Sequence, residues 1–298
     1  MRIVIIGAVA AGTSAAAKAR RNSEDAQITV YEQDRFISYS GCGMPYFLGG
    51  EVEHAEELTP RDPEFFRSKY NVEIKTEHEV LSVSPGTKSL SVKNLRTGEF
   101  FTDVYDKLIF ATGARAVTPP IPGRELEHVF TLRNINDMLR IRSFLDESKP
   151  KSAVIIGTGF IGLEMCESLS RLGVTVTLLE KLPQVTPGLD PDMAVLVEDH
   201  LKKSGITVLT GVSIDRITGH EVLLADGTSI AAELVLLSTG VRPNAELAAE
   251  AGVQLGVSGA ILVNDRMETN LPDLSACGDC IEQFHVVTGK QVYRPLGS

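Results

Sequence analysis

Short apolar runs that alternate with longer amphipathic stretches organise this chain. Residues 2–6 and 153–156 are almost wholly apolar, as expected for strands buried on both faces of a parallel sheet. Each is followed by a helical stretch rich in small residues, and then by a second apolar strand that ends at an acid, Glu32 or Glu180. This repeated order predicts an α/β protein built from two Rossmann-like units of three layers each.

Shorter runs predict an antiparallel β excursion within each unit. In the second unit a hairpin covers residues 213–225, with its turn at Gly219-His220. In the first unit four strand-like runs are turned at Gly86 and Gly98. These four runs are Val72–Lys75, Val80–Val83, Leu90–Leu95 and Glu99–Asp103.

Both small-residue helices begin at a glycine-rich turn. The turn at residues 157–162 is a complete G-x-G-x-x-G, with glycines for the turn itself, for room beside a pyrophosphate and for helix–strand packing. The turn at residues 7–12 has Val9 in place of the middle glycine, so an ordinary βαβ unit is the alternative there. With strand, helix and terminal acid at the usual distances, the two turns predict two dinucleotide sites.

The acids that end the second strands are expected to bind ribose hydroxyls. Glu180 would repel a 2′-phosphate and so favours NADH over NADPH, although Lys181 beside it leaves NADPH open. We expect one domain to comprise residues 1–116 and 244–298 and the other to comprise residues 117–243. The crossing between them is marked by Pro119, Pro120 and Pro122.

One cysteine lies between the two halves of the first unit, in the stretch 38–50. Cys42 is flanked by glycines, and the residues Pro45 and Gly49-Gly50 predict one short helix directly after it. Unpaired N–H groups and the helix dipole at such a place favour a thiolate. The alternative is a small buried apolar residue, which is what a free cysteine commonly becomes.

Two further cysteines, Cys277 and Cys280, form a C-x-x-C. Such a pair permits a redox couple or half of a zinc site. The sequence offers no second ligand pair, so we expect no metal and interpret both as small residues flanking Gly278-Asp279.

The first small-residue helix carries basic residues on one face. Ser14, Lys18 and Arg21 are spaced i, i+4 and i+7, with Arg20 beside them. This pattern is typical of a solvated basic face, and it also suits the docking of an anionic group such as a phosphate.

Charge and composition exclude several classes of protein. A net charge of −10 argues against a general binder of nucleic acid or anionic membranes. Four cysteines in 298 residues are no disulfide framework. The N-terminus runs straight into the first strand and no apolar run reaches membrane length, so we expect a cytoplasmic protein.

Two dinucleotide sites around one cysteine suggest a flavin that takes a hydride from a nicotinamide and passes electrons onward through sulfur. With these motifs, and with residues 241–244 and 274–280, the sequence resembles the pyridine nucleotide–disulfide oxidoreductase family over nearly its whole length. The resemblance implies FAD and NADH as cofactors, with NADPH possible. In that family the segment matching 274–280 closes the flavin site, and its aspartate, here Asp279, bonds the ribityl chain.

Within the family the chain resembles the single-cysteine branch, because position 47 is Phe47 and the second cysteine of glutathione and lipoamide reductases is missing. The branch holds NADH oxidases, NADH peroxidases, coenzyme A-disulfide reductases and persulfide-reducing relatives. Its oxidases and peroxidases carry a histidine in the first glycine loop, where this chain has Ala10. The resemblance therefore implies reduction of coenzyme A disulfide or of a persulfide, with Cys42 as the catalytic residue that forms a mixed disulfide.

The motifs and the resemblance together assign the remaining site residues. FAD is expected to be bound by Gly7, Ala8, Ala10, Ala11, Gly12, Glu32, Ala111, Thr112, Gly113, Gly278 and Asp279. NAD(P)H is expected to be bound by Gly157, Gly159, Phe160, Ile161, Gly162, Glu164, Glu180 and Gly240. In the coenzyme A-disulfide reductases, residues matching Ser14, Lys18 and Arg21 hold the coenzyme A nucleotide, and those matching Ser38 and Cys42 meet its sulfur end.

Family members continue well past the position of Ser298 into an interface domain, and full-length relatives are homodimers. The resemblance thus implies that the C-terminal dimerisation domain is missing from this chain. Two alternatives to the reductase stay open. One is an NADH oxidase or peroxidase that uses a Cys42 sulfenic acid, and the other is a truncated FAD-binding redox sensor or partner module that is not an enzyme.

Overall fold

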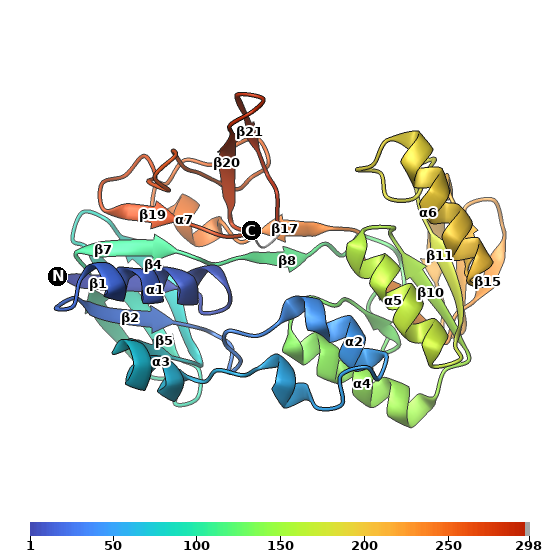
Figure 1. The fold of residues 1–298 in the computed structure, drawn as a ribbon, viewed down its shortest axis with the longest axis horizontal. Helices are drawn as coiled ribbons and strands as arrows, with labels where there is room; N and C mark the ends of the chain where they lie inside the picture. The colour runs from blue at the N-terminus through green and yellow to red at the C-terminus, as the bar shows by residue number, and fades with distance from the viewer. Residues whose placement is uncertain (296–298) are drawn as a thin grey trace. The chain divides into compact units, whose positions relative to one another are not determined.

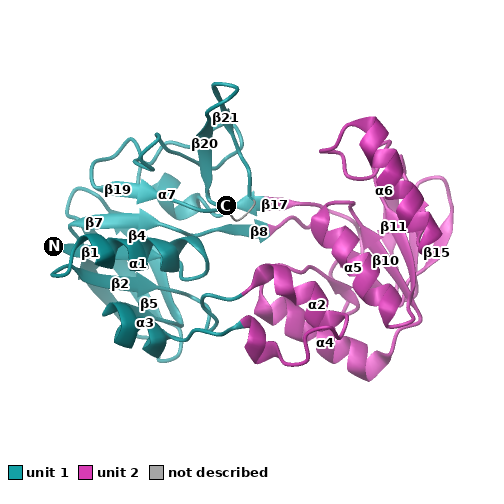
Figure 2. Cartoon of the chain, in the orientation of Figure 1, with its two compact units in different colours: residues 1–39, 59–115, 242–298 teal, residues 40–58, 116–241 magenta. Residues whose placement is uncertain are grey.

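The computed structural model describes residues 1–295 and confirms the mixed α/β class. The chain forms two compact units, shown in different colours in Figure 2. Unit 1 comprises residues 1–39, 59–115 and 242–298, and unit 2 comprises residues 40–58 and 116–241. The stretch 40–58, which lies inside the first domain expected from the sequence, packs within unit 2. The end of the expected segment 244–298, residues 296–298, lies outside the described residues.

A parallel five-stranded sheet forms the centre of unit 1, in the order β19-β7-β1-β2-β3 (Figure 1). Its strands are β1 (Arg2–Ile6), β2 (Gln27–Tyr31), β3 (Glu73–Lys75), β7 (Lys107–Phe110) and β19 (Leu274–Ala276). Alternate residues of β1 point to opposite faces. Ile3 and Ile5 pack with residues of helices α1 (Ala11–Asn22) and α3 (Pro63–Tyr70).

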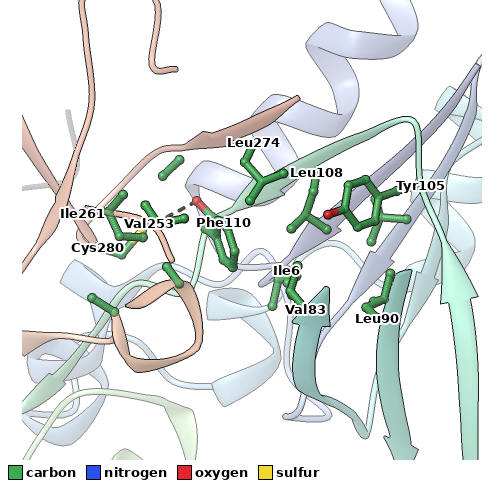
Figure 3. Close-up of a cluster of buried hydrophobic side chains, with 14 of the residues drawn as sticks. Ile6, Val83, Leu90, Tyr105, Leu108, Phe110, Val253, Ile261, Leu274 and Cys280 are labelled. Atoms are coloured by element: carbon green, nitrogen blue, oxygen red, sulfur yellow. Dashed lines mark hydrogen bonds between the residues drawn. The ribbon is translucent and has the colours of Figure 1, made fainter. Parts of the chain in front are cut away.

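The other face of this sheet packs against an antiparallel sheet. That sheet consists of β4 (His78–Ser84), β5 (Ser89–Asn94) and β6 (Phe100–Val104). Ile6, Leu108 and Phe110 meet Val83 and Leu90 in the core cluster drawn in Figure 3.

The first excursion therefore has three strands, and the expectation of four was wrong for Val72–Lys75. That run supplies β3, which pairs in parallel with β2 in the register Val30↔Ile74. Val72, directly before β3, is fully buried, and helix α3 packs against this edge strand.

The remaining elements of unit 1 lie at or after the points where the chain leaves unit 1 at residue 115 and returns to it at residue 242. They are β8 (Ala114–Ala116) and β17 (Val241–Pro243), which pair with each other, and α7 (Glu246–Glu250), β18 (Ile261–Leu262), β20 (Ile281–His285) and β21 (Lys290–Val292).

Unit 2 repeats the plan of unit 1 with a parallel sheet in the order β12-β11-β10-β16-β9. These strands are β9 (Val129–Phe130), β10 (Ser152–Ile156), β11 (Thr175–Leu179), β12 (Thr207–Leu209) and β16 (Leu234–Leu237). Helix α5 (Phe160–Arg171) packs on β10 and β11, and the predicted hairpin forms an antiparallel sheet on the other face. The other elements are α4 (Ile135–Ser148), α6 (Pro191–Lys203), β13 (Ile214–Ile217), β14 (Glu221–Leu224) and β15 (Ser229–Ala231).

The stretch 40–58 adds three short helical turns to unit 2. They are η1 (Gly41–Gly43), α2 (Met44–Leu48) and η2 (Ala55–Leu58). Helix α2 packs against α5 and α4 (Figure 1). Within residues 1–295, no helix combines the length and apolar character needed to cross a membrane.

Candidate functional site

The first glycine turn, residues 7–12, joins β1 to α1, and there is no room for a side chain at its two glycines. A Cβ on Gly7 would stand 2.2 Å from the carbonyl oxygen of Ala111, and one on Gly12 would stand 1.8 Å from the carbonyl oxygen of Gly7. Gly7 also has φ +104°, a backbone conformation that favours glycine. Helix α1 therefore begins directly at the carboxyl end of the sheet. Its N-cap, Ala10, supplies no side-chain cap, so the N–H groups of the first turn suit an external anion.

Glu32 ends β2 and is tied back to this turn. Its Oε2 accepts a hydrogen bond from the Ala8 N–H at 2.7 Å, and its Oε1 accepts one from the Asp34 N–H at 2.9 Å. Burial raises the pKa of the Glu32 carboxyl, and the backbone N–H donors oppose that rise. The acid is thus held beside the turn, as the expected ribose contact requires.

The loop Ala111-Thr112-Gly113, which follows β7, is clamped by Asn244. The Thr112 hydroxyl donates to the Asn244 carbonyl oxygen at 2.5 Å, and the Asn244 amide donates to the Thr112 carbonyl oxygen at 2.9 Å. The Asn244 N–H also donates to the Gly113 carbonyl oxygen at 2.9 Å. Asn244 belongs to one of the sequence motifs, the stretch 241–244, but its role as a clamp is visible only in the structure.

The segment around Gly278 reaches the start of α1. Gly278 has φ +81°, and a Cβ on it would stand 2.6 Å from the Cβ of Ala11. Asp279 follows it and is half-buried, and its carbonyl oxygen accepts a hydrogen bond from the Tyr293 hydroxyl at 3.1 Å. The structure thus brings the FAD residues expected from both ends of the sequence to one edge of the unit 1 sheet.

The second glycine turn is packed like the first at Gly157 and Gly162, and it has free space beside its middle glycine, Gly159. A Cβ on Gly157 would stand 2.5 Å from the Ser238 carbonyl oxygen, and one on Gly162 would stand 2.2 Å from the Gly157 carbonyl oxygen. A Cβ on Gly159 would meet no atom within 4 Å. Packing therefore explains two of these glycines, whereas Gly159 faces free space at the start of α5, where a pyrophosphate would fit.

Glu180 repeats the position of Glu32 with one additional donor. Its Oε1 accepts from the Leu182 N–H at 2.9 Å. Its Oε2 accepts from the Thr158 N–H at 3.1 Å and from the Thr158 hydroxyl at 2.6 Å. Thr158 was not among the residues assigned from the sequence, because a threonine at a variable position of the motif carries no signal of its own.

The other residues expected at the nicotinamide site lie on or near α5. Phe160 is 64% exposed, Ile161 is half-buried, and burial raises the pKa of the Glu164 carboxyl. Gly240 follows β16 with φ +106°, and a Cβ on it would meet no atom within 4 Å. Phe160 thus presents a large aromatic ring to solvent at the start of α5.

Cys42 lies in η1, exposed, between Gly41 and Gly43. The helix that follows, α2, has only five residues, with Pro45 in its first turn as expected. Gly50, with φ +82°, is the left-handed residue at its end. The interpretation of Cys42 as a buried apolar residue is therefore wrong.

The other three cysteines are shielded from solvent. Cys166 and Cys280 are buried and Cys277 is half-buried. Burial raises the pKa of the thiols of Cys166 and Cys277 to about 12. The Cys280 thiol donates to the Cys277 carbonyl oxygen at 3.3 Å and packs in the core of unit 1 (Figure 3). Cys42 is thus the exposed thiol of the chain.

The basic residues of α1 differ in what their side chains contact. Ser14, Lys18 and Arg21 lie at least partly in solvent, and neither Lys18 nor Arg21 forms an ion pair within residues 1–295. Arg20 differs, because its guanidinium donates to five backbone carbonyls, including those of Tyr70 at 2.8 Å and Ala26 at 2.6 Å. Arg20, which lies beside the basic face in the sequence, therefore ties α1 to the chain around it.

Ser38, expected near the sulfur end of the substrate, lies in unit 1. It has φ +47°, and its N–H donates to the Ala8 carbonyl oxygen at 2.9 Å. Ser38 is thereby fixed to the first glycine turn, and it lies four residues before Cys42 in the sequence.

Two strand–turn–helix–strand units, each with an acid tied to its glycine turn, define a two-domain dinucleotide-binding protein with an exposed cysteine. The profile of the pyridine nucleotide-disulphide oxidoreductase family matches residues 1–293. The chain belongs to this family.

Two known proteins similar to this chain are named for different activities. It is 37% identical over 302 residues to an NADH oxidase of Methanocaldococcus jannaschii, covering 100% of this chain and 67% of that protein. It is 34% identical over 280 residues to a coenzyme A disulfide reductase of Staphylococcus haemolyticus, covering 94% of this chain and 63% of that protein.

Among solved structures, an NAD-dependent persulfide reductase from A. fulgidus superposes with a TM-score of 0.96 at 38% identity. The match covers 100% of this chain and 56% of that one. The chain thus spans between about half and two thirds of the length of these relatives.

Proposed function

We propose that this chain is a flavin-dependent NAD(P)H oxidoreductase that reduces coenzyme A disulfide, or persulfides of coenzyme A and other small thiols, through Cys42. The observation that carries the proposal is the exposure of Cys42 between two glycines, on a stretch that packs against the helix of the second glycine turn. The similarity to a coenzyme A disulfide reductase and to a persulfide reductase supports it.

The residues of both turns fit the two cofactors. Gly159 leaves the space that a pyrophosphate needs, and Gly278 and Asp279 lie at the start of α1, where the expected FAD site would be closed. FAD, when bound, accepts a hydride from NAD(P)H and supplies the electron pair that reduces a disulfide. Glu180 favours NADH, because its carboxylate would repel a 2′-phosphate.

Cys42 supplies the sulfur chemistry. Its thiolate attacks one sulfur of coenzyme A disulfide, so that a Cys42–coenzyme A disulfide forms and the first coenzyme A thiolate leaves. Two electrons and a proton then release the second coenzyme A thiol and restore the Cys42 thiolate. With a persulfide substrate, the same exchange ends in hydrosulfide. The exposure of Cys42 leaves its sulfur open to a bulky disulfide.

Lys18 and Arg21 are the residues proposed to hold the phosphates of coenzyme A, with Ser14 on the same face and Ser38 at the sulfur end. Both cations reach solvent and lack an acidic partner within residues 1–295, so their charges are free for an anion. The four cysteines, all unpaired, suit a reducing compartment, which supports a cytoplasmic location.

An NADH oxidase or peroxidase is the second candidate, because the Methanocaldococcus jannaschii relative is named an NADH oxidase. Ala10 weighs against it, since alanine offers no acid or base beside a sulfenic acid.

Stopped-flow reduction of the purified chain by NADH, followed by thiol release from coenzyme A disulfide or persulfide, tests the proposal. We expect rapid thiol release from the native chain and a loss of at least about 100-fold in Cys42→Ser, because serine cannot form the mixed disulfide. Undiminished thiol release in that variant would reject the mechanism. Fast NADH consumption with oxygen or peroxide, and none with either sulfur substrate, would favour the oxidase.

A further inference from the structure

A hydroxyl group joins three segments of the second nucleotide unit. The Thr158 hydroxyl lies 2.6 Å from Glu180 Oε2 and accepts a hydrogen bond from the Thr186 N–H at 3.0 Å. Thr158 is only 1% exposed and Glu180 9%. The glycine turn, the acid after β11 and the loop before α6 therefore meet at one buried oxygen.

The direction of these bonds is fixed. A hydroxyl has one proton to donate, and the Thr186 N–H can only donate to it. The Thr158 proton must therefore point to the carboxylate of Glu180. Oε2 then receives two protons, from the Thr158 N–H and hydroxyl, while Oε1 receives one from the Leu182 N–H. The free acceptor position left to Glu180 is consequently on Oε1, and the carboxylate cannot rotate without breaking three hydrogen bonds.

Unit 1 provides an internal comparison. Ala8 occupies the place of Thr158 and donates only its N–H to Glu32. The same strand–turn–helix–strand framework thus folds with alanine at this position, so folding does not require the hydroxyl.

Thr186 adds a second polar group at the same place. Its backbone has φ +44°, which is rare for residues other than glycine, and the residue is 8% exposed. Its hydroxyl is buried without a hydrogen-bond partner in the part of the chain that the structure describes. A buried hydroxyl left unpaired is costly, so the bond from the Thr186 N–H to the Thr158 hydroxyl holds this loop in place against that cost.

We infer that Thr158 is a positioning residue for nucleotide recognition, and that it holds Glu180 and the Thr186 loop ready for the adenosine ribose of NADH. The inference rests on the proposed NAD(P)H site. Glu180 then offers one oxygen to a ribose hydroxyl, and the fixed carboxylate charge rejects a 2′-phosphate. Without the Thr158 hydroxyl the carboxylate keeps only two backbone N–H donors and loses its link to the Thr186 loop, so it is held less firmly and the preference for NADH weakens.

Direct binding of NADH and NADPH to the FAD-saturated chain, measured by isothermal titration calorimetry, tests this inference. In Thr158→Val we expect the Kd for NADH to rise about tenfold while the Kd for NADPH changes less than about threefold. Thr158→Ser keeps the hydroxyl and should restore the native ratio of the two affinities. Thr158→Ala serves if the valine variant does not fold, because unit 1 already carries alanine there.

Two further variants separate recognition from stability. Thr177→Val, a matched change in β11 with no side-chain hydrogen bond within residues 1–295, should leave both affinities unchanged. Thr186→Gly removes the unpaired hydroxyl and relieves the backbone but keeps the N–H that bonds Thr158, so it should leave the ratio of the two affinities unchanged.

An unchanged NADH-to-NADPH ratio in Thr158→Val and Thr158→Ala, in a native chain that binds NADH, would overturn the inference alone. Failure of Thr158→Ser to restore the ratio would also overturn it. A native chain that binds neither nucleotide would instead overturn the proposed NAD(P)H site itself.

Discussion

Gly49 lies directly against Ser168, so that a Cβ on Gly49 would stand 3.1 Å from both the Cα and the Cβ of that serine. The contact joins the end of α2 to the middle of α5. One turn further along α5, Arg171 pairs with Glu51 at 2.8 Å. The stretch that carries Cys42 is therefore fastened to the helix of the second glycine turn at two points.

Replacing Gly49 should loosen this attachment. We expect Gly49→Val to lower the free energy of unfolding by about 1–3 kcal/mol, because the valine side chain has no room beside Ser168. Urea denaturation measures the loss, and the rate of Cys42 alkylation in the folded chain reports whether the stretch has moved. Gly86→Ala is the control, because a Cβ there meets no atom within 4 Å. Equal stability of the native chain and Gly49→Val would contradict the contact.

The solvent-facing cations of α1 should affect the binding of coenzyme A disulfide and little else. In Lys18→Ala/Arg21→Ala we expect the KM for coenzyme A disulfide to rise about tenfold, and the rise to shrink as salt is added, because exposed charges are screened. Pantetheine disulfide, which lacks the nucleotide phosphates, should show no change. A KM that stays within twofold of the native value would remove the docking role from this face.

Arg20→Ala provides the contrast for this experiment. Its guanidinium bonds backbone carbonyls, so we expect a loss of about 2 kcal/mol in the free energy of unfolding without an effect on the KM in the folded fraction.

Because of Asp273, the stability of unit 1 should depend on pH in the acid range. Lys107 and then Lys88, each at 2.5 Å, lower the pKa of its carboxyl to about 2. A depressed folded-state pKa stabilises the fold above the unfolded value of 3.8, and this stability is lost as pH falls toward 2.

Asp273→Asn should therefore be less stable than the native chain at pH 7, and the two curves of unfolding free energy should converge near pH 2. Asparagine tolerates the φ of +67° at this position, so the backbone is not at issue. Denaturation across this pH range at low and high salt measures the effect, with the exposed Asp265→Asn as control. Parallel curves for Asp273→Asn and the native chain would show that the ion pairs do not contribute.

Local patterns predicted the two parallel sheets well, because a buried apolar run followed by a small-residue turn has few other structures open to it. Both turns, both acids and the hairpin at Gly219-His220 lie where their sequences indicate. The direction in which Val72–Lys75 pairs could not be predicted, since a run of four residues carries no signal for parallel or antiparallel pairing. That choice is made by β2, more than forty residues away.

The roles of residues whose partners are distant in the sequence could not be predicted either. Arg20 looks like its neighbour Arg21 in the sequence, and only the carbonyls of Tyr70 and Asn71 distinguish the two. The packing of residues 40–58 with unit 2 depends on Gly49 meeting Ser168, and nothing near either residue in the sequence predicts that contact.

The chain crosses between the units four times, which sets an order for synthesis on the ribosome. Unit 2 is complete once residue 241 has emerged, whereas β7 of unit 1 still lacks its neighbour β19 until residues 274–276 arrive. The nascent protein therefore has an open sheet edge at β7 while residues 116–241 of unit 2 are translated, a state in which strands readily pair with the wrong partner. Neither unit can be produced by a single cut, because each consists of segments that the other interrupts.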